Sequence, residues 1–333
     1  MNWARGFTAS YYVSVVDPDS WRDIDRIEIT SGSVTRSNSG LRESADVKCT
    51  RYDLRRELWV RIWLDAEQGS GTEHVPLFTG LACSPSTEID GYSHTYPLEC
   101  YSVLKPAQDV LLQRGWYAPA NASGADLVRT LLSVSPAPIV IDGISPLLKQ
   151  SIVAEDGESN LSMTDKILTA INWRLRISGD GVIHICPKAT EISATFDSLE
   201  NDIIEPQVSL EQDWYECPNV FRAVMNELSA IARDEDPDSF LSTVSRGREV
   251  WKEDTKCALN DGETIAEYAM RRLKEEQAYA ISASYYRRYM PNVCVTDLVR
   301  LHHPAQGIDG VFSVTSQTID LAYGARVSEK VSM

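Results

Sequence analysis

The stretch Leu58-Trp59-Val60-Arg61-Ile62-Trp63-Leu64 has the alternation of a β-strand, in which successive side chains point to opposite faces. One face is wholly apolar and carries Leu58, Val60, Ile62 and Leu64. The opposite face carries Trp59, Arg61 and Trp63. Because a strand face turned to water should not carry two tryptophans, we expect this face to be covered as well. A second layer of the same chain and a contact with another subunit both account for such a cover.

Four further runs in the N-terminal part of the chain have strand character and are separated by turn residues. They are residues 7–16, 26–35, 76–83 and 94–101. Within the second run, the pair Ser31-Gly32 is expected to interrupt the strand. Short strands at this spacing predict a small sandwich or barrel.

Residues 106–188 change character and predict a compact α/β module. Ser123 is expected to cap a helix through residue 134, followed by a short buried strand at Ile139-Val140-Ile141. Ser162-Met163-Thr164-Asp165 is expected to begin a second helix, with Asp165 in the first turn, where the helix dipole favours negative charge. A hairpin over residues 173–177 and 182–186 turns at Ser178-Gly179-Asp180-Gly181 and completes the module.

Residues 189–216 contain eight acidic residues and no lysine or arginine. Such a composition is typical of a solvated connector, and we interpret the stretch in that way. Beyond it, residues 219–226 and 228–233 have strand character.

Asp261-Gly262-Glu263 is expected to open a helix that reaches residue 279. Its predicted apolar stripe is Ile265, Ala269, Met270 and Leu273, and the charge pairs Glu267–Arg271 and Arg271–Glu275 are spaced to support it.

The C-terminal part returns to strands, at residues 279–286, 293–302, 311–321 and 325–331. The last three follow the order strand, loop, strand, turn, strand, which is also the order of residues 58–64, 76–83 and 94–101. The two sets share little sequence identity, so the echo is one of pattern. It is what duplicated β-domains would leave behind.

The 333 residues include 48 acidic and 32 basic side chains, a formal net charge of −16. A surface this acidic repels nucleic acid, since phosphate binding requires Lys and Arg; solubility alone accounts for the same charge. The seven cysteines form no C-x-x-C pair, which is typical of a chain that folds in a reducing cytoplasm. We expect no secretory signal at the N-terminus, and no apolar stretch approaches the ~20 residues of a membrane-spanning helix.

The motifs of the commonest enzymes are missing from the sequence. It contains no G-x-S-x-G, no H-E-x-x-H, no phosphate-binding G-x-x-x-x-G-K-[ST] and no G-x-G-x-x-G. His302-His303 are adjacent, so on a strand they would point to opposite faces and not to one metal ion. We therefore expect no catalytic, cofactor-binding or metal-binding residue.

The order of these segments resembles that of the tail hub proteins of bacteriophages and contractile injection machines, the late-control-protein-like group. The resemblance spans nearly the whole chain. It is carried by Pro76-Leu77-Phe78-Thr79-Gly80, by residues 154–162 with the helix and hairpin that follow them, and by Gly310-Val311-Phe312-Ser313-Val314.

The resemblance implies a β-dominated α+β fold with two related small β-barrel domains of the tail-tube kind, an α/β domain and an inserted helical segment. The expected boundaries are 1–104 for the first barrel, 105–188 for the α/β domain and 189–333 for the second barrel. The insertion is expected at about 234–280 and contains a helix.

In this family, three subunits contribute two barrels each to a pseudo-sixfold ring that joins the tail tube to the tip or spike and lets DNA pass. The resemblance thus implies a homotrimeric, non-enzymatic structural protein of the virion tail, assembled in the host cytoplasm. Its expected partners are a tail tube or distal tail protein on one side and a tip, spike or fibre protein on the other, without membrane insertion. Trp59, Arg61 and Trp63 are the candidate subunit contact.

Some relatives continue into a peptidase or lysozyme-like domain. Since this chain stops at Met333, a cell-wall-cutting role is expected of another protein. Two other classes of function stay open: a carbohydrate- or receptor-binding virion protein, which would also be β-rich with exposed aromatic rings, and a cell-wall hydrolase.

Overall fold

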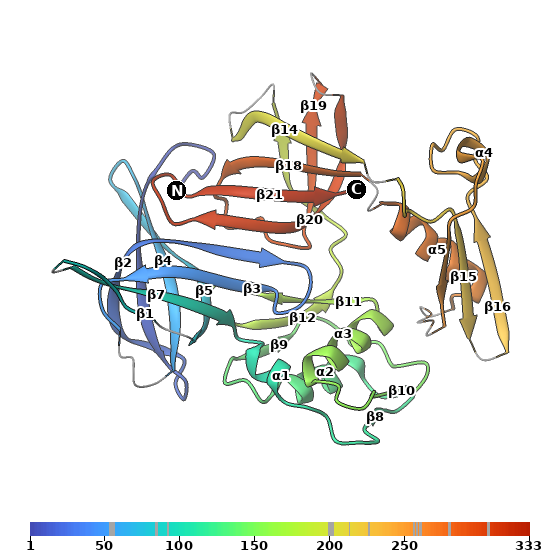
Figure 1. Cartoon of the computed structure of the whole chain (residues 1–333), viewed down its shortest axis with the longest axis horizontal. Coiled ribbons are helices and arrows are strands. Elements are labelled where there is room, and N and C mark those ends of the chain that lie inside the picture. Colours follow the sequence, from blue (N-terminus) through green and yellow to red (C-terminus); the bar gives the residue numbers. More distant parts are fainter. Residues whose placement is uncertain are drawn as a thin grey trace.

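Strands of both ends of the chain join into one large sheet, with the helices set to its side (Figure 1). The computed structural model describes residues 1–52, 57–83, 86–91, 93–198, 203–212, 214–225, 227–255, 257, 259, 262–278, 281–304 and 307–333. The fold is β-dominated, as the sequence predicts.

The N-terminal part, here called the first β-unit, forms a closed circuit of paired strands in the order β1-β4-β5-β7-β3-β2-β1. A short strand, β6, adds to β7. The strands are β1 (Thr8–Asp17), β2 (Arg22–Ser37), β3 (Glu43–Cys49), β4 (Leu58–Gln68), β5 (Gly71–Cys83), β6 (Glu88–Asp90) and β7 (Ser93–Ser102). The apolar face predicted for residues 58–64 lies in the core of this unit, where Val60, Ile62 and Leu64 are fully buried.

The predicted break at Ser31-Gly32 is wrong. Strand β2 continues through both residues, with a register shift between Ile29 and Ser31. Glycine is required there because a Cβ on Gly32 would lie 2.5 Å from the carbonyl oxygen of Asp46 on the neighbouring strand. The glycine thus permits close pairing where we expected a break.

The C-terminal strands, here called the second β-unit, pair in the order β13-β19-β20-β21-β18-β14. When the strands of each unit are numbered along the chain, leaving out the short β6, this order is 1-4-5-6-3-2. The first β-unit, β1-β4-β5-β7-β3-β2, has the same order. The two units are joined by antiparallel pairing of Ser33–Ser37 on β2 with Ser316–Asp320 on β20. The strands are β13 (Ile192–Asp197), β14 (Ile204–Gln212), β18 (Ile281–Arg288), β19 (Leu298–His303), β20 (Ile308–Asp320) and β21 (Arg326–Ser332).

Reading residues 189–216 as a solvated connector is also wrong, because β13 and β14 belong to this sheet. Phe196 is fully buried in the core of the second unit. The cations that pair with the acidic residues come from distant sequence: Arg326 pairs with Glu205, and Lys330 with Glu211. Residues 199–202 and 213 of this stretch lie outside the described residues.

The middle of the chain forms the α/β unit, whose helices pack on a small sheet in the order β11-β12-β9. Ser123 caps α2, as predicted, but α3 begins earlier than predicted. Ser159 is its cap, accepting from the backbone N–H of Ser162, so Asp165 lies in mid-helix and pairs with Arg42. The elements are α1 (Lys105–Asp109), β8 (Tyr117–Ala118), α2 (Gly124–Leu132), β9 (Ile139–Ile141), β10 (Ile152–Val153), α3 (Asn160–Ala170), β11 (Trp173–Ile177) and β12 (Ile183–Pro187).

The strand predicted to be buried at 139–141 is β9, which pairs with β12 alone and leaves Val140 41% exposed. Ile139 and Ile141 pack on the core of the α/β unit while Val140 points to the opposite face of the small sheet, so an apolar run did not imply burial on both faces.

An insert between β14 and β18 forms a separate small unit at one side of the molecule (Figure 1). It contains β15 (Val220–Met225), β16 (Leu228–Arg233), α4 (Thr243–Arg246), β17 (Trp251–Asp254) and α5 (Ile265–Ala278). Its core joins α5 to the sheet β16-β15-β17. The insertion expected from about residue 234 therefore begins earlier, since β15 and β16 pair with β17 and not with the large sheet.

Helix α5 differs in detail from its prediction. It begins after Thr264, whose hydroxyl accepts from the N–H of Glu267 while the Glu267 carboxylate accepts from the N–H of Thr264. Glu267 is thus part of a capping box, and Arg271 pairs with Glu263 and Glu275. Met270, predicted in the buried stripe, is 42% exposed. Residue 279 lies outside the described residues.

Candidate functional site

The face of β4 that carries Trp59, Arg61 and Trp63 is covered by the chain itself. The turn between β11 and β12 docks on it: the Asp180 carbonyl accepts from Arg61 Nη2 at 3.0 Å and from Trp21 Nε1 at 2.9 Å. Trp59 lies beside Trp21, with ring centroids 5.7 Å apart, and both pack against the core of the α/β unit. The intramolecular layer that the sequence left open therefore accounts for Trp59 and Arg61.

Two glycines permit this docking. A Cβ on Gly179 would lie 1.8 Å from the carbonyl oxygen of Pro76 on β5, and one on Gly181 would lie 2.8 Å from Thr79. Thr79 donates to the Gly179 carbonyl at 2.8 Å, so the turn is bound through backbone atoms that a side chain would displace. The two units can approach this closely because glycine has no side chain.

Trp63, like Trp59, is half-buried. Its indole N–H donates to Asp23 Oδ2 at 2.8 Å, and its ring stacks on Tyr12 with a centroid distance of 6.3 Å. Arg61 Nη1 donates to the other oxygen of the same carboxylate at 2.6 Å. The structure thus brings the three predicted residues together, while their role in a subunit contact stays a prediction.

The second β-unit buries a charged network in its core. Glu329 is 1% exposed and accepts from Tyr285 Oη at 2.5 Å, from Arg287 Nη2 at 2.5 Å and from Gln317 Nε2 at 2.6 Å. The burial and the nearby Glu329 carboxylate raise the pKa of Tyr285 well above its usual value. Because both carboxylate oxygens are hydrogen-bonded, the buried charge is fully compensated.

A second buried ion pair lies where the two β-units meet the α/β unit. Arg36 Nε on β2 is 3.1 Å from Glu43 Oε1 on β3, and both side chains are buried. Unlike Glu329, Glu43 has one oxygen, Oε2, without a hydrogen-bond partner among the described residues. Burial raises the pKa of Glu43 to about 7, opposed by the positive charge of Arg36.

The outer face of the joined sheet, opposite to these cores, is rich in hydroxyl groups. One row of neighbouring side chains crosses both β-units and runs Tyr101, Ser44, Thr35, Thr318, Ser328 and Tyr286. A parallel row runs Ser37, Ser316, Lys330, Ser284 and Ser209. We call this surface the hydroxyl-rich face, made by Ser33, Thr35, Ser37, Ser44, Ser209, Ser282, Ser284, Ser316, Thr318 and Ser328.

The net charge of the chain is not concentrated on the hydroxyl-rich face. Charged residues beside it are largely paired there, as in Glu205 with Arg326 and Glu211 with Lys330. An acidic row of Glu99, Asp46 and Asp320 lies along one margin, in register with Ser33. The face is therefore polar, with hydroxyl groups and paired charges over most of it and acidic residues along one margin.

Sequence reasoning missed this face, although its signal is present. Ser33, Thr35 and Ser37 alternate with buried residues on one strand, and Ser282 and Ser284 do so on another. Hydroxyl groups at every second position mark a strand face that is wet but uncharged. The pattern has no single chemical meaning until the strands are assembled side by side.

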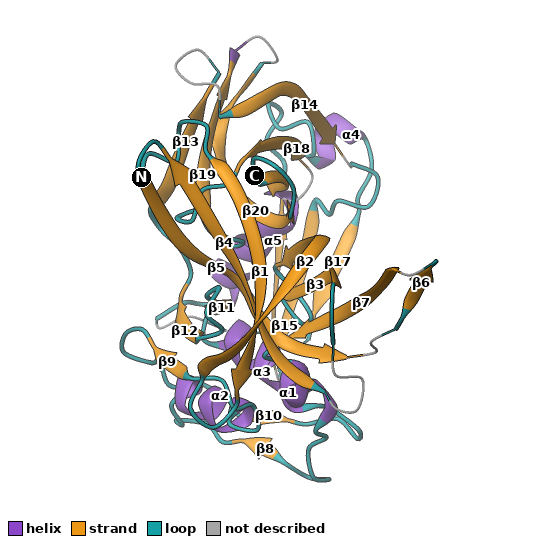
Figure 2. Cartoon of the chain, turned by 90° about the vertical axis from the view of Figure 1, so that its left-hand side faces the viewer, coloured by secondary structure: helices purple, strands orange, loops and turns teal. Residues whose placement is uncertain are grey.

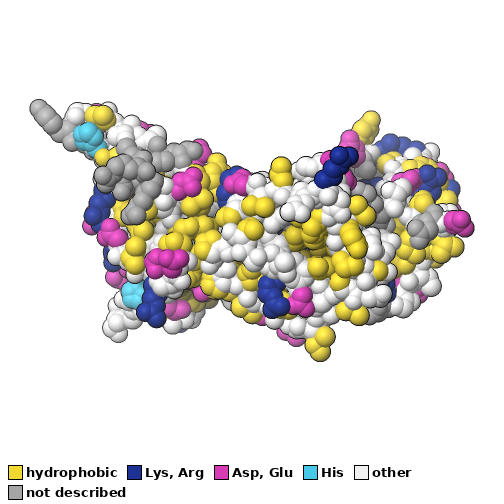
Figure 3. All heavy atoms as spheres, turned by 90° about the horizontal axis from the view of Figure 1, so that it is seen from below, with side chains coloured by type: hydrophobic (Ala, Val, Ile, Leu, Met, Phe, Trp, Pro, Cys, Tyr) yellow, Lys and Arg dark blue, Asp and Glu magenta, His cyan; other side chains and the backbone are white. Residues whose placement is uncertain are grey.

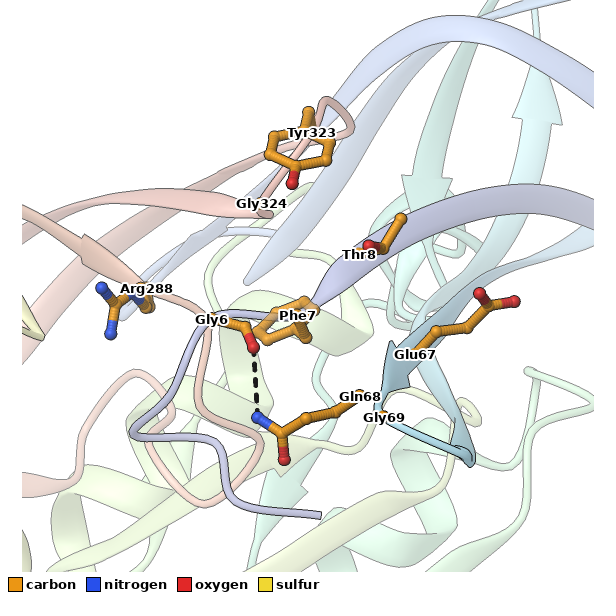
Figure 4. A pocket seen from close by; sticks show the side chains of 9 residues that line it. All are labelled: Gly6, Phe7, Thr8, Glu67, Gln68, Gly69, Arg288, Tyr323 and Gly324. Carbon is orange, nitrogen blue, oxygen red and sulfur yellow. Dashed lines mark hydrogen bonds between the residues drawn. The ribbon is translucent and has the colours of Figure 1, made fainter.

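Two cavities among the described residues contain no recognisable catalytic arrangement. One, of about 380 Å³, lies at the junction of the β-units, where Gln68 Nε2 donates to the Gly6 carbonyl at 3.1 Å (Figure 4). It is lined by Gly6, Phe7, Thr8, Glu67, Gln68, Gly69, Arg288, Tyr323 and Gly324. A larger one, of about 1080 Å³, separates α3 and β10 from the insert residues Met225, Cys257 and Leu259.

A metal centre and a membrane-spanning helix are both absent from the described part of the chain. No group of three or more His, Cys, Asp or Glu side chains in it is placed to hold a metal ion. No helix in it is long and apolar enough to cross a membrane.

The underside of the molecule exposes hydrophobic side chains near its middle (Figure 3). Exposed apolar residues of the α/β unit include Leu111, Tyr117, Ile144, Leu147 and Val153, of which Tyr117 and Val153 are cross-strand neighbours. Isolated exposed apolar residues are common in proteins, but neighbouring ones are typical of contact surfaces.

No protein-family model matches the sequence, and no curated protein matches it. Solved structures do match. The tail protein from Neisseria meningitidis MC58 is 16% identical, with 97% of each chain covered and a TM-score of 0.72. The 43 kDa tail protein of prophage MuSo2 from Shewanella oneidensis is 13% identical, with 96% of this chain and 95% of that chain covered and a TM-score of 0.66.

Prophage tail protein gp18 from Listeria monocytogenes EGD-e is 11% identical, with 97% of this chain and 94% of that chain covered and a TM-score of 0.59. At these identities the likeness is one of fold. The resemblance drawn from the order of segments is confirmed at that level: the chain has the fold of phage tail proteins.

Proposed function

We propose that this chain is a non-enzymatic hub protein of a phage-like tail, three copies of which form a pseudo-sixfold ring between the tail tube and the tail tip or spike. The observation that carries the proposal is the continuous sheet across two β-units of the same strand order, with a hydroxyl-rich face on one side. A ring with six similar positions can be built from three chains if each chain contributes two similar units.

The hydroxyl-rich face supports a lumen through which DNA passes. A passing polyanion is retained by Lys and Arg that are free to bind phosphate. On this face Arg326 and Lys330 are already paired with carboxylates, and most other positions carry uncharged hydroxyl groups. The low affinity of the proposed lumen thus comes from neutral polar groups and paired charges more than from a wall of acidic residues.

In this proposal the first β-unit and the second β-unit are the two related domains of the tail-tube kind, with boundaries near residues 104 and 188. The tail tube or a distal tail protein binds one rim of the ring, and a tip, spike or fibre protein binds the other. The place of the protein is the virion tail, after assembly in the host cytoplasm.

The mass of the purified chain in solution, from light scattering coupled to size exclusion, tests the proposal. A mass of three chains with a ring in negative-stain images is the expected result. A chain that stays monomeric over a wide concentration range, and that does not bind to tail tubes of its phage, would contradict it. Binding to a glycan array by such a monomer would instead favour a receptor-binding protein.

A further inference from the structure

The seam of the second β-unit cannot be closed by its own neighbouring strands. β13 runs parallel to β19, and the remaining strands of the unit alternate in direction, so β13 and β14 run the same way. Parallel neighbours need a crossover of about a dozen residues or more. Only residues 198–203 join β13 to β14, so β14 keeps a free edge.

Cross-strand pairs show which part of the first unit corresponds to this edge. In the first unit a rung of buried pairs runs Ala82, Cys100, Ala45, Val34. In the second unit the equivalent rung runs Val314, Val331, Ala283, Leu210. Leu210 on β14 thus stands where Val34 stands on β2.

The two equivalent residues differ in what lies beyond them. Val34 pairs across its second edge with Ile319 of β20, and both are buried in the joint between the units. Leu210 is 43% exposed, and β14 pairs only with β18 among the described strands. The second unit therefore presents the same joint without a partner.

The partner that would repeat the joint can be identified in the same way. The end of β20 pairs with β21 on one edge and with β2 on the other. In the first unit, β6 lies on the same edge of β7, the equivalent of β21, and begins where the joint ends: in the register above, Glu88 stands where Asp320 stands. The other edge of β6 is free among the described residues. Ile89 at its centre is 66% exposed, and β6 lies at the tip of an arm that projects from the body (Figure 2).

We propose that β14 of one copy pairs with β6 of a second copy in antiparallel orientation, so that a joint of the kind made by β2 and β20 within each chain also forms between chains. The pairing is head to tail, because each copy contributes a different strand, and such joints form rings where the rotation closes. It satisfies two exposed strand edges and covers one apolar side chain on each, Leu210 and Ile89.

The charges beside the two edges are compatible with this pairing. Glu211 on β14 is held by Lys330, and Glu88 on β6 is held by Lys48 at 2.8 Å. Each lysine lowers the pKa of its glutamate. The two carboxylates beside the joint are therefore each neutralised by a lysine of their own chain. Ser209 continues the hydroxyl-rich face across the joint.

This inference rests on the proposed ring and is tested by two variants that each block one edge. Leu210→Lys and Ile89→Lys place a charge in the joint, while both side chains are exposed in the isolated chain. Each variant alone is expected to be monomeric by light scattering. A 1:1 mixture is expected to stop at two chains, because only one of its possible joints has two intact edges. Val244→Lys, at a 61% exposed position on α4, is the control and should keep the wild-type mass.

The outcomes separate the joint from the ring. If the wild-type chain assembles and both edge variants keep its full mass, the ring stands and the proposed joint is wrong. A mixture that regains the full wild-type mass also contradicts a head-to-tail joint. If the wild-type chain itself never assembles, the proposed function fails first.

Hydrogen exchange gives a second measurement that does not depend on the variants folding. Amides of β14 and β6 should gain protection in the assembled wild type relative to dilute monomer. Equal protection in the two states overturns the joint.

Discussion

The two β-units share a strand order but differ at their seams and in their buried carboxylates. β1 pairs antiparallel with both β4 and β2 and closes the first unit, whereas β13 runs parallel to β19 and leaves the second unit open. Glu329 accepts three side-chain partners in the second unit, whereas Glu43 in the first keeps one oxygen without a partner among the described residues. The difference teaches that strand order and strand direction are separate properties of a fold.

The reason lies in how the chain enters each unit. In the first unit, residues 18–21 join β1 to β2, and a connection this short makes neighbouring strands antiparallel. β13 follows β12 after residues 188–191, and this short connection determines from which end the chain enters the sheet. A strand that enters from the other end runs in the opposite direction, and the seam of the second unit then stays open among the described strands.

Breaking the network of the second unit should have the largest effect. Glu329→Ala removes the acceptor of Tyr285, Arg287 and Gln317 and leaves the Arg287 guanidinium buried without its counter-charge. We expect the free energy of unfolding to fall by about 3–5 kcal/mol, measured by urea denaturation. Glu211→Ala, in an exposed pair on the same sheet, is the control and should leave stability nearly unchanged. Equal effects of the two variants would mean that the buried network is no more important than a surface pair.

The carboxylate of the first unit should respond to pH instead. Because the pKa of Glu43 is raised from 4.5 to about 7 in the folded chain, the folded state binds the proton more tightly than the unfolded state. Its contribution to stability is then present below pH ~4.5 and lost as the pH rises through about 7, by up to about 3 kcal/mol.

The measurement is the difference in unfolding free energy between wild type and Glu43→Gln across that range. Glutamine stays neutral, so the wild type should lose stability relative to the variant as the pH rises. A difference that is constant with pH would mean that Arg36 keeps the carboxylate ionised throughout.

The docking of the α/β unit on the first β-unit should be sensitive to one added methyl group. Gly179→Ala places a Cβ 1.8 Å from the Pro76 carbonyl oxygen, so the turn must move away from β5. We expect a loss of about 1–3 kcal/mol, as for other overpacked sites, together with faster proteolysis in the turn at residues 178–181. Gly6→Ala, with no atom within 4 Å of its added Cβ, is the matched control and should behave as wild type. The second β-unit has no equivalent contact with this turn, so its hydrogen exchange should not change.

The smallest effect on stability is expected at Trp63, which is half-buried, like Trp59, in the predicted subunit contact. Trp63→Ser removes the stacking on Tyr12 and the bond to Asp23, both near the surface. The monomer should unfold at nearly the wild-type temperature, while the fraction of assembled chain falls if Trp63 contacts another subunit. Trp251→Ser, at a 48% exposed position in the insert, is the control. Unchanged assembly in Trp63→Ser would remove this residue from the contact.

Much of the fold could be read from local patterns, because these depend on neighbours within a few residues. The alternation of residues 58–64 predicts β4, Ser123 predicts the start of α2, and the Gly-Asp-Gly turn predicts the β11–β12 hairpin. The echo between the two sets of strands, β4-β5-β7 and β19-β20-β21, was also visible as a pattern. These features need only the period of the side chains and the conformations of glycine and of helix caps.

Only the tertiary structure decided what those patterns are for. The acidic stretch forms β13 and β14. The cations that pair with it, Arg326 and Lys330, lie more than a hundred residues away in sequence, so the stretch alone does not show them. Trp59 and Arg61 are covered by a turn that the sequence places far from them, and the hydroxyl-rich face exists only when β2, β20, β21 and β18 lie side by side. Sequence periodicity determines which face of a strand is apolar, but the partner of that face is determined by packing between distant segments, which no local pattern contains.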